Sequence, residues 1–213
     1  MKKLLLAGVV GPLVFIVVFL LEGATRPGYS AWRHYVSQLA TGDFGWMQVI
    51  NFVFCGGLVL AFAIGLRHAI KGTPGSIAGP LLLGLFAVSL LVAGVFVTDP
   101  ALGYPVGAPQ VHTTHGMIHG LAGLAAFSLL AMTAFVMAWH FAASRERRWA
   151  IYSAGVGLLI IAFFIASTTV SVMDAAGAWQ NAPTGFFQRI AIIGGWTWIA
   201  MVALRELRLD ATE

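Results

Sequence analysis

Residues 4–21, LLLAGVVGPLVFIVVFLL, decide the fold, because this run carries no charged side chain. A helix that crosses the hydrocarbon core of a bilayer needs about 20 mostly apolar residues. Five further stretches are similarly apolar, near 47–66, 77–98, 114–141, 149–172 and 188–204. The sequence therefore predicts an all-α protein, a polytopic bundle of six transmembrane helices, with residues 1–213 forming a single integral membrane domain.

The composition supports this class and excludes others. Of the 213 residues, 59% are hydrophobic and only 9% are charged, whereas a soluble domain carries about 25% charged residues. The single cysteine, Cys55, excludes an intramolecular disulfide and a cysteine-rich metal site. The chain contains no phosphate-binding loop, dinucleotide fingerprint or nucleic-acid motif. We therefore expect the lipid bilayer, and no nucleic acid, as its partner.

The basic residues predict the orientation of the bundle. Nine of the twelve Lys and Arg residues lie at the two ends of the chain and in the loops after the second and fourth predicted helices. The other three are Arg26, Arg33 and Arg189. Loops rich in Lys and Arg stay on the cytoplasmic side of a membrane. Both termini are therefore predicted to be cytoplasmic.

Several polar residues fall on the predicted outer side, where ionisable groups at membrane depth suggest function. His115 and His119 are four residues apart, which places both imidazoles on one face of a helix. Such a pair suits zinc or another divalent metal. Asp99 is the candidate third ligand or catalytic carboxylate, and His112 joins the set only if Thr113 does not cap the helix. The alternative is a pair of interfacial histidines bonded to their neighbours.

Ser37 and Arg189 are further candidates on the same side. Ser37 lies in the segment VSQLA three residues after His34, and a serine near a histidine can act as a nucleophile or position a water. Its alternative role is to cap a short helix within residues 31–40. Arg189 and His34 are candidates for substrate binding. Arg189 is expected to form an ion pair with Asp99 or Asp174, or to hold an anionic headgroup.

These residues leave three functions open, and they do not decide whether the protein is an enzyme. The first is a membrane-embedded site on the outer side that binds or acts on a lipid-like molecule, as a metal-dependent hydrolase in its more specific form. The second is a non-enzymatic transporter, sensor or assembly partner. The third is a haem- or quinone-binding protein, which would require His34 to face His115 or His119.

Five motifs occur in the order typical of one family. They are VSQLA at 36–40, GWMQVINFVFCGG at 45–57, FVTDP at 96–100, THGMIHG at 114–120 and FFQRIAIIGGWTW at 186–198. With these motifs the chain resembles the family catalogued as domain of unknown function 998. The resemblance implies a small six-helix protein of the cytoplasmic membrane of a prokaryote, and it implies no activity. Its polar positions correspond here to Ser37, Asp99, His115, His119 and Arg189.

The residue types are also similar to those of alkaline ceramidases and adiponectin-receptor-like proteins. Those proteins combine a serine, an aspartate and a His-x-x-x-His pair around zinc in a membrane bundle. This chain has six predicted helices instead of seven, and its histidine pair lies on the fourth. The similarity is therefore one of chemistry and does not indicate common ancestry.

Overall fold

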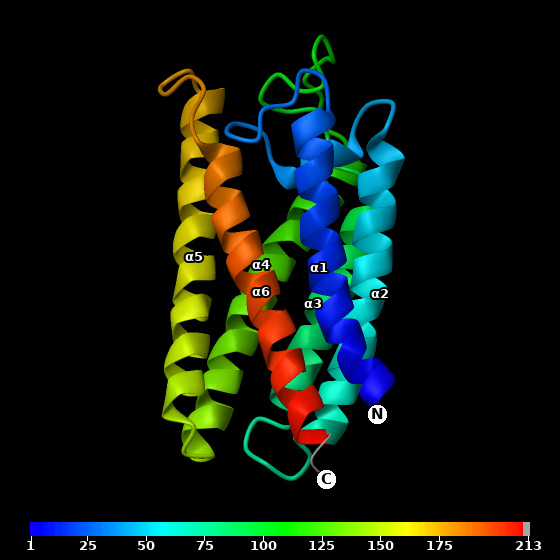
Figure 1. Cartoon of the computed structure of the whole chain (residues 1–213). Coiled ribbons are helices and arrows are strands. Elements are labelled where there is room, and N and C mark those ends of the chain that lie inside the picture. Colours follow the sequence, from blue (N-terminus) through cyan, green and yellow to red (C-terminus); the bar gives the residue numbers. More distant parts are fainter. Residues whose placement is uncertain (211–213) are drawn as a thin grey trace.

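The computed structural model describes residues 1–210, and over this range it is helical without named strands. Its six long helices are α1 (Lys2–Thr25), α2 (Gly45–Ala69), α3 (Ala78–Val95), α4 (Thr114–Ala143), α5 (Arg147–Ala175) and α6 (Thr184–Asp210) (Figure 1). Each is long and apolar enough to cross a membrane. The predicted all-α bundle of six membrane-spanning helices is therefore confirmed.

The helices form a ring in which each one packs against the next in the chain and α6 closes against α1. Lipid offers no hydrophobic drive for association, so close approach of small residues contributes much of the contact. Gly65 of α2 lies against the backbone of Leu4, and Gly157 of α5 lies against the ring of Phe135. The largest fully buried side chains include Phe15, Phe62, Phe141, Met137 and Trp198.

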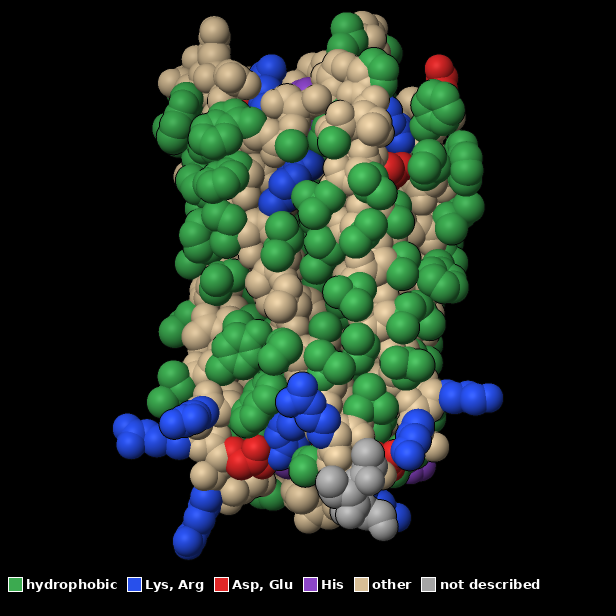
Figure 2. All heavy atoms as spheres, viewed as in Figure 1, with side chains coloured by type: hydrophobic (Ala, Val, Ile, Leu, Met, Phe, Trp, Pro, Cys, Tyr) green, Lys and Arg blue, Asp and Glu red, His purple; other side chains and the backbone are tan. Residues whose placement is uncertain are grey.

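The surface of the bundle has the charge pattern of a membrane protein. Figure 2 shows hydrophobic side chains along its length, and Lys and Arg side chains gathered at the end that carries both termini. Exposed apolar residues such as Leu13, Phe54 and Leu158 form part of this apolar surface. The start of α1 and the end of α6 thus share one end, as the even number of spans predicts, and the cytoplasmic location of this end stays a prediction.

The opposite end is covered by three connections, residues 26–44, 96–113 and 176–183, which we call the outer layer. The first contains η1, a 3-10 helix at Val36–Ala40, which lies within the residues 31–40 where the sequence predicts a short helix. Arg26 anchors this segment by donating from Nη1 to the carbonyl oxygens of Leu39 at 3.2 Å and Thr41 at 3.3 Å. The outer layer thereby places η1 over the interior of the ring.

Candidate functional site

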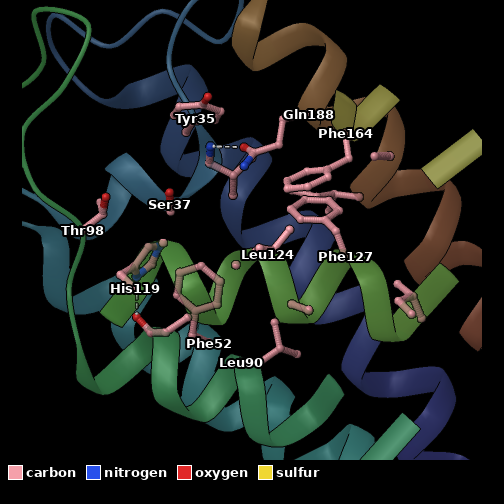
Figure 3. Close-up of a pocket in the computed structure, with 18 of the residues that line it drawn as sticks. Tyr35, Ser37, Phe52, Leu90, Thr98, His119, Leu124, Phe127, Phe164 and Gln188 are labelled. Carbon is pink, nitrogen blue, oxygen red and sulfur yellow. Dashed lines mark hydrogen bonds between the residues drawn. The ribbon is translucent and has the colours of Figure 1, made fainter. Parts of the chain in front are cut away.

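A cavity of about 440 Å³ lies inside the ring beneath η1, and all six helices contribute to its wall (Figure 3). Its wall is mostly apolar and includes the aromatic rings of Phe15, Phe52, Phe86, Phe127, Phe164 and Trp196. The rings of Phe15 and Trp196 are stacked with centroids 4.0 Å apart. Among the described residues, no Asp, Glu, Lys or Arg lines this space. The cavity is therefore suited to an apolar molecule.

Among the histidines of residues 1–210, His119 alone lines the cavity, and its hydrogen bonds define its tautomer. Its Nδ1 lies 3.0 Å from the carbonyl oxygen of Ala93 and 2.8 Å from that of Phe96. A carbonyl oxygen only accepts hydrogen bonds, so Nδ1 must carry the hydrogen. In the neutral ring, Nε2 is then an acceptor without a partner in residues 1–210. Ala93 lies in the last turn of α3 and Phe96 directly follows the helix, so the C-terminal end of α3 fixes the orientation of the imidazole.

Ser37 and Gln188 bring further polar groups to the same end of the cavity (Figure 3). The Ser37 hydroxyl makes no hydrogen bond within the described part of the chain. Gln188 of α6 accepts a hydrogen bond at Oε1 from the backbone N–H of Val36 at 2.7 Å, which holds η1 in place. The Nε2 of Gln188 has no partner within residues 1–210. This end therefore offers neutral donors and acceptors.

Asp99, His112 and His115 lie outside the cavity wall. The Thr113 backbone N–H and hydroxyl donate to Asp99 at 2.8 and 2.6 Å, and these bonds hold the pKa of the carboxyl below its usual range. Thr113 also caps α4 by accepting from the N–H of Gly116 at 3.0 Å, as the sequence predicts, and this leaves His112 exposed in the loop. His115 is exposed and packs against the ring of Phe96.

The structure therefore separates the two histidines that the sequence pairs. His119 points into the cavity, whereas His115 lies one turn nearer the start of α4, where the helix is exposed. Over the described residues, no group of three or more His, Cys, Asp or Glu side chains is placed to hold a metal ion. Binding of zinc or another divalent metal by His115, His119 and Asp99 stays a prediction.

Arg189 is buried in the outer part of the bundle, and its partners differ from those expected. Its Nη1 donates to the carbonyl oxygens of Ala31, His34 and Gly185 at 2.8, 3.1 and 3.0 Å, and its Nη2 donates to the Tyr29 hydroxyl. The expected ion pair with Asp99 or Asp174 is wrong, because Asp174 accepts instead from Arg33 at 2.8 and 2.7 Å. Arg189 thus ties α6 to the outer layer.

His34 is also tied into the outer layer and does not accompany Ser37 in the cavity. Its Nδ1 accepts from the N–H of Ser30 at 2.9 Å, so Nε2 is the donor to the carbonyl oxygen of Leu102 at 3.2 Å. Burial lowers the pKa of His34, and the nearby guanidinium groups of Arg33 and Arg189 lower it further. Both nitrogens are occupied, so this arrangement leaves neither free for a haem iron.

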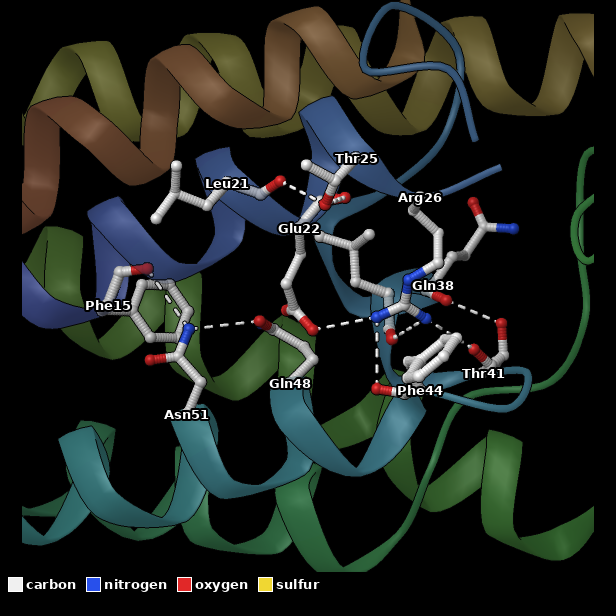
Figure 4. Close-up of polar contacts among 11 residues, drawn as sticks. Phe15, Leu21, Glu22, Thr25, Arg26, Gln38, Thr41, Phe44, Gln48 and Asn51 are labelled. Carbon is white, nitrogen blue, oxygen red and sulfur yellow. Dashed lines mark hydrogen bonds and ion pairs between the residues drawn. The ribbon is translucent and has the colours of Figure 1, made fainter. Parts of the chain in front are cut away.

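Sequence analysis missed a second polar group, between the outer ends of α1 and α2 (Figure 4). Glu22 is 3% exposed and pairs with Arg26 at 2.9 Å, and its Oε2 has no partner among the described residues. Gln48 accepts from Asn51 at 3.1 Å. A cavity of about 310 Å³ adjoins Glu22 and Arg26. The four-residue spacing of Glu22 and Arg26 at the end of an apolar run is the signal that could have revealed this pair.

Comparisons with known proteins add a family and no activity. Residues 9–205 match the family described as "Protein of unknown function (DUF998)". No curated protein and no solved structure matches the chain. The match covers most of the sequence and agrees with the five motifs, so this six-helix protein belongs to the DUF998 family.

Proposed function

We propose that this protein binds a neutral lipid-like molecule in the cavity inside its ring of helices. One observation carries the proposal: an aromatic cavity ends in uncharged polar groups that have no partners within the described residues. A binding site for an amphiphile needs these two parts, an apolar wall for the chain and a few placed polar groups for the head.

The polar groups limit the chemistry of the head. Nε2 of His119 accepts a hydrogen bond, Nε2 of Gln188 donates one, and the Ser37 hydroxyl can do either. A hydroxyl, ester or quinone carbonyl can use these groups. A phosphate or an ammonium group would lose its hydration without gaining a charged partner, which is costly. The proposed ligands are therefore neutral lipids.

Photolabelling in a defined bilayer tests this proposal. The purified protein is placed in phosphatidylcholine nanodiscs that contain a photoreactive diacylglycerol, and the labelled residues are mapped by mass spectrometry. We expect labels on the cavity wall of α4 and α5, and weaker labelling in the variant Ser37→Ala. A photoreactive phosphatidylglycerol is the matched anionic probe. Equal labelling of the cavity by both probes, or no label there, would overturn the proposal.

Metal-dependent hydrolysis of the bound lipid is a second candidate function, which one observation favours. The N–H at Nδ1 of His119 is held by backbone carbonyls, the arrangement that orients zinc-binding histidines. In this version His115 and Asp99 must move toward His119, and Ser37 positions the attacking water. The test is the metal content of the purified protein. The hypothesis requires stoichiometric metal in the wild type and its loss in the double variant His115→Ala/His119→Ala.

A further inference from the structure

We propose that the cavity receives its ligand sideways from the outer half of the bilayer, through a gap between α4 and α5. This inference rests on the proposed function, and it adds the source of the ligand: a lipid already dissolved in the membrane, as opposed to a solute in water. The gap follows from the residues that line the cavity, from the packing below it and from the outer layer above it.

The first argument is exposure. Three residues of the cavity wall, Gly120, Leu124 and Thr168, are also exposed on the outside of the bundle. Gly120 and Leu124 belong to α4 and Thr168 to α5, so the wall is open where these two helices face each other. Leu124 is 52% exposed. α5 is also the least buried of the six spans, so this side of the ring has a large apolar surface outside the bundle.

The second argument is the change in packing along the two helices. Nearer the termini, Phe135 of α4 lies against Gly157 of α5, and a Cβ built at Gly157 would approach its ring to 2.9 Å. Next, the rings of Phe127 and Phe164 stack with centroids 4.5 Å apart. Further outward, a Cβ built at Gly120 or at Gly123 meets no atom within 4 Å. The helices diverge in this direction (Figure 1).

The third argument is that the outer layer closes the cavity toward water. Arg33 pairs with Asp174 at 2.7 Å, and the indole N–H of Trp32 donates to the carbonyl oxygen of Asn181 at 3.2 Å. Gln38 donates to the carbonyl oxygen of Ala101, which joins η1 to the connection between α3 and α4. A ligand arriving from water must break these bonds, whereas a lipid passing between α4 and α5 breaks none of them.

The test compares the kinetics of two glycine-to-leucine variants. Gly120→Leu places a side chain in the gap, and Gly155→Leu places the same side chain on α5, outside the cavity wall, where a Cβ also meets nothing within 4 Å. Loading is followed by stopped-flow transfer of a photoreactive diacylglycerol from phosphatidylcholine vesicles, with timed photolysis. We expect Gly120→Leu to slow loading and release about tenfold relative to Gly155→Leu, as association rates within one site vary over one to three decades.

The outcomes separate this inference from the proposed function. If the wild type labels the cavity but Gly120→Leu and a second variant, Leu124→Trp, load at the rate of Gly155→Leu, the lateral route is wrong and the binding function stands. Faster loading in Arg33→Gln, which loosens the outer layer, would also overturn the lateral route. Absence of cavity labelling in the wild type would overturn the binding function itself.

Discussion

The outer layer and the cavity beneath it both carry polar side chains, but these side chains differ in whether they have hydrogen-bond partners within the fold. In the outer layer the ring of His34 has both nitrogens bonded, and the guanidinium of Arg189, which reaches that layer from α6, donates to three carbonyl oxygens and the Tyr29 hydroxyl. In the cavity, Ser37 and one nitrogen each of His119 and Gln188 lack partners in residues 1–210. A buried polar group that is satisfied stabilises the fold, and one that is not is available to a ligand.

The two roles alternate within one short motif. In VSQLA, Gln38 donates to the carbonyl oxygens of Ala101 and Tyr104 and accepts from the N–H of Tyr35 at 2.9 Å. Its neighbour Ser37 faces the cavity. Adjacent residues thus differ in what their substitution should cost. Four experiments test the wider difference between groups bonded within the fold and groups that face the cavity, beginning with the largest expected effect.

Removing the most heavily bonded group should destabilise the protein most. Arg189→Met leaves the carbonyl oxygens of Ala31 and His34 without their charged donor. We expect the free energy of unfolding to fall by about 3 kcal/mol, since hydrogen bonds to charged groups are the stronger ones. Thermal unfolding in detergent at one heating rate measures the effect. Arg208→Met, an exposed arginine, is the control, and equal midpoints for the two variants would refute the structural role.

Adding a single methyl group at the contact between α6 and the outer layer should also lower the free energy of unfolding. A Cβ at Gly185 overlaps the carbonyl oxygen of His34, so Gly185→Ala must displace η1 or α6. We expect a loss of about 1–3 kcal/mol, as for other overpacked sites. Gly155→Ala has open space and should be neutral or stabilising. A stable Gly185→Ala protein with unchanged cavity labelling would show that this contact is dispensable.

The protonation of His34 should make stability depend on pH. Burial depresses the pKa of His34 in the folded state below its ordinary value, about 6.5. The full contribution to stability is therefore present above that value and is lost as pH falls toward the folded pKa, because the unfolded chain binds the proton first. Unfolding midpoints of wild type and His34→Gln across this range provide the measurement. The difference between the two midpoints should be constant above pH 6.5, and the wild type should lose stability relative to His34→Gln as the pH falls below that value; a difference that stays constant across the whole range would contradict the assignment.

Substituting Ser37, which faces the cavity, should have the smallest effect on stability and a selective effect on ligand binding. Ser37 has no hydrogen-bond partner in the described fold, so Ser37→Ala should change stability by less than about 0.5 kcal/mol. If its hydroxyl bonds the ligand, affinity for the diacylglycerol probe should fall about fivefold, the equivalent of one net hydrogen bond. A variant that loses stability without losing affinity would move Ser37 into the structural group.

The fold follows from the sequence because apolar length alone decides which segments span a membrane. Even the cap at Thr113 has a local signature, and the structure confirms it. The partners of Arg189 in the outer layer have no such signature, because they include backbone carbonyls from a segment some 155 positions away. The different environments of His115 and His119 could not be predicted from the sequence either. They depend on where α3 ends, at Val95, because only His119 lies deep enough to bond the carbonyl oxygens of Ala93 and Phe96 near that end.

The stacked rings of Phe127 and Phe164 have a consequence for selectivity. They end the open part of the α4–α5 interface, and along the proposed lateral route the space outward of them has a fixed depth while its side is continuous with the surrounding lipid. A hydrocarbon tail too long for that depth need not fold back, because its terminal carbons can stay among the acyl chains outside. Such a protein would distinguish lipids by their heads and remain indifferent to the length of their tails.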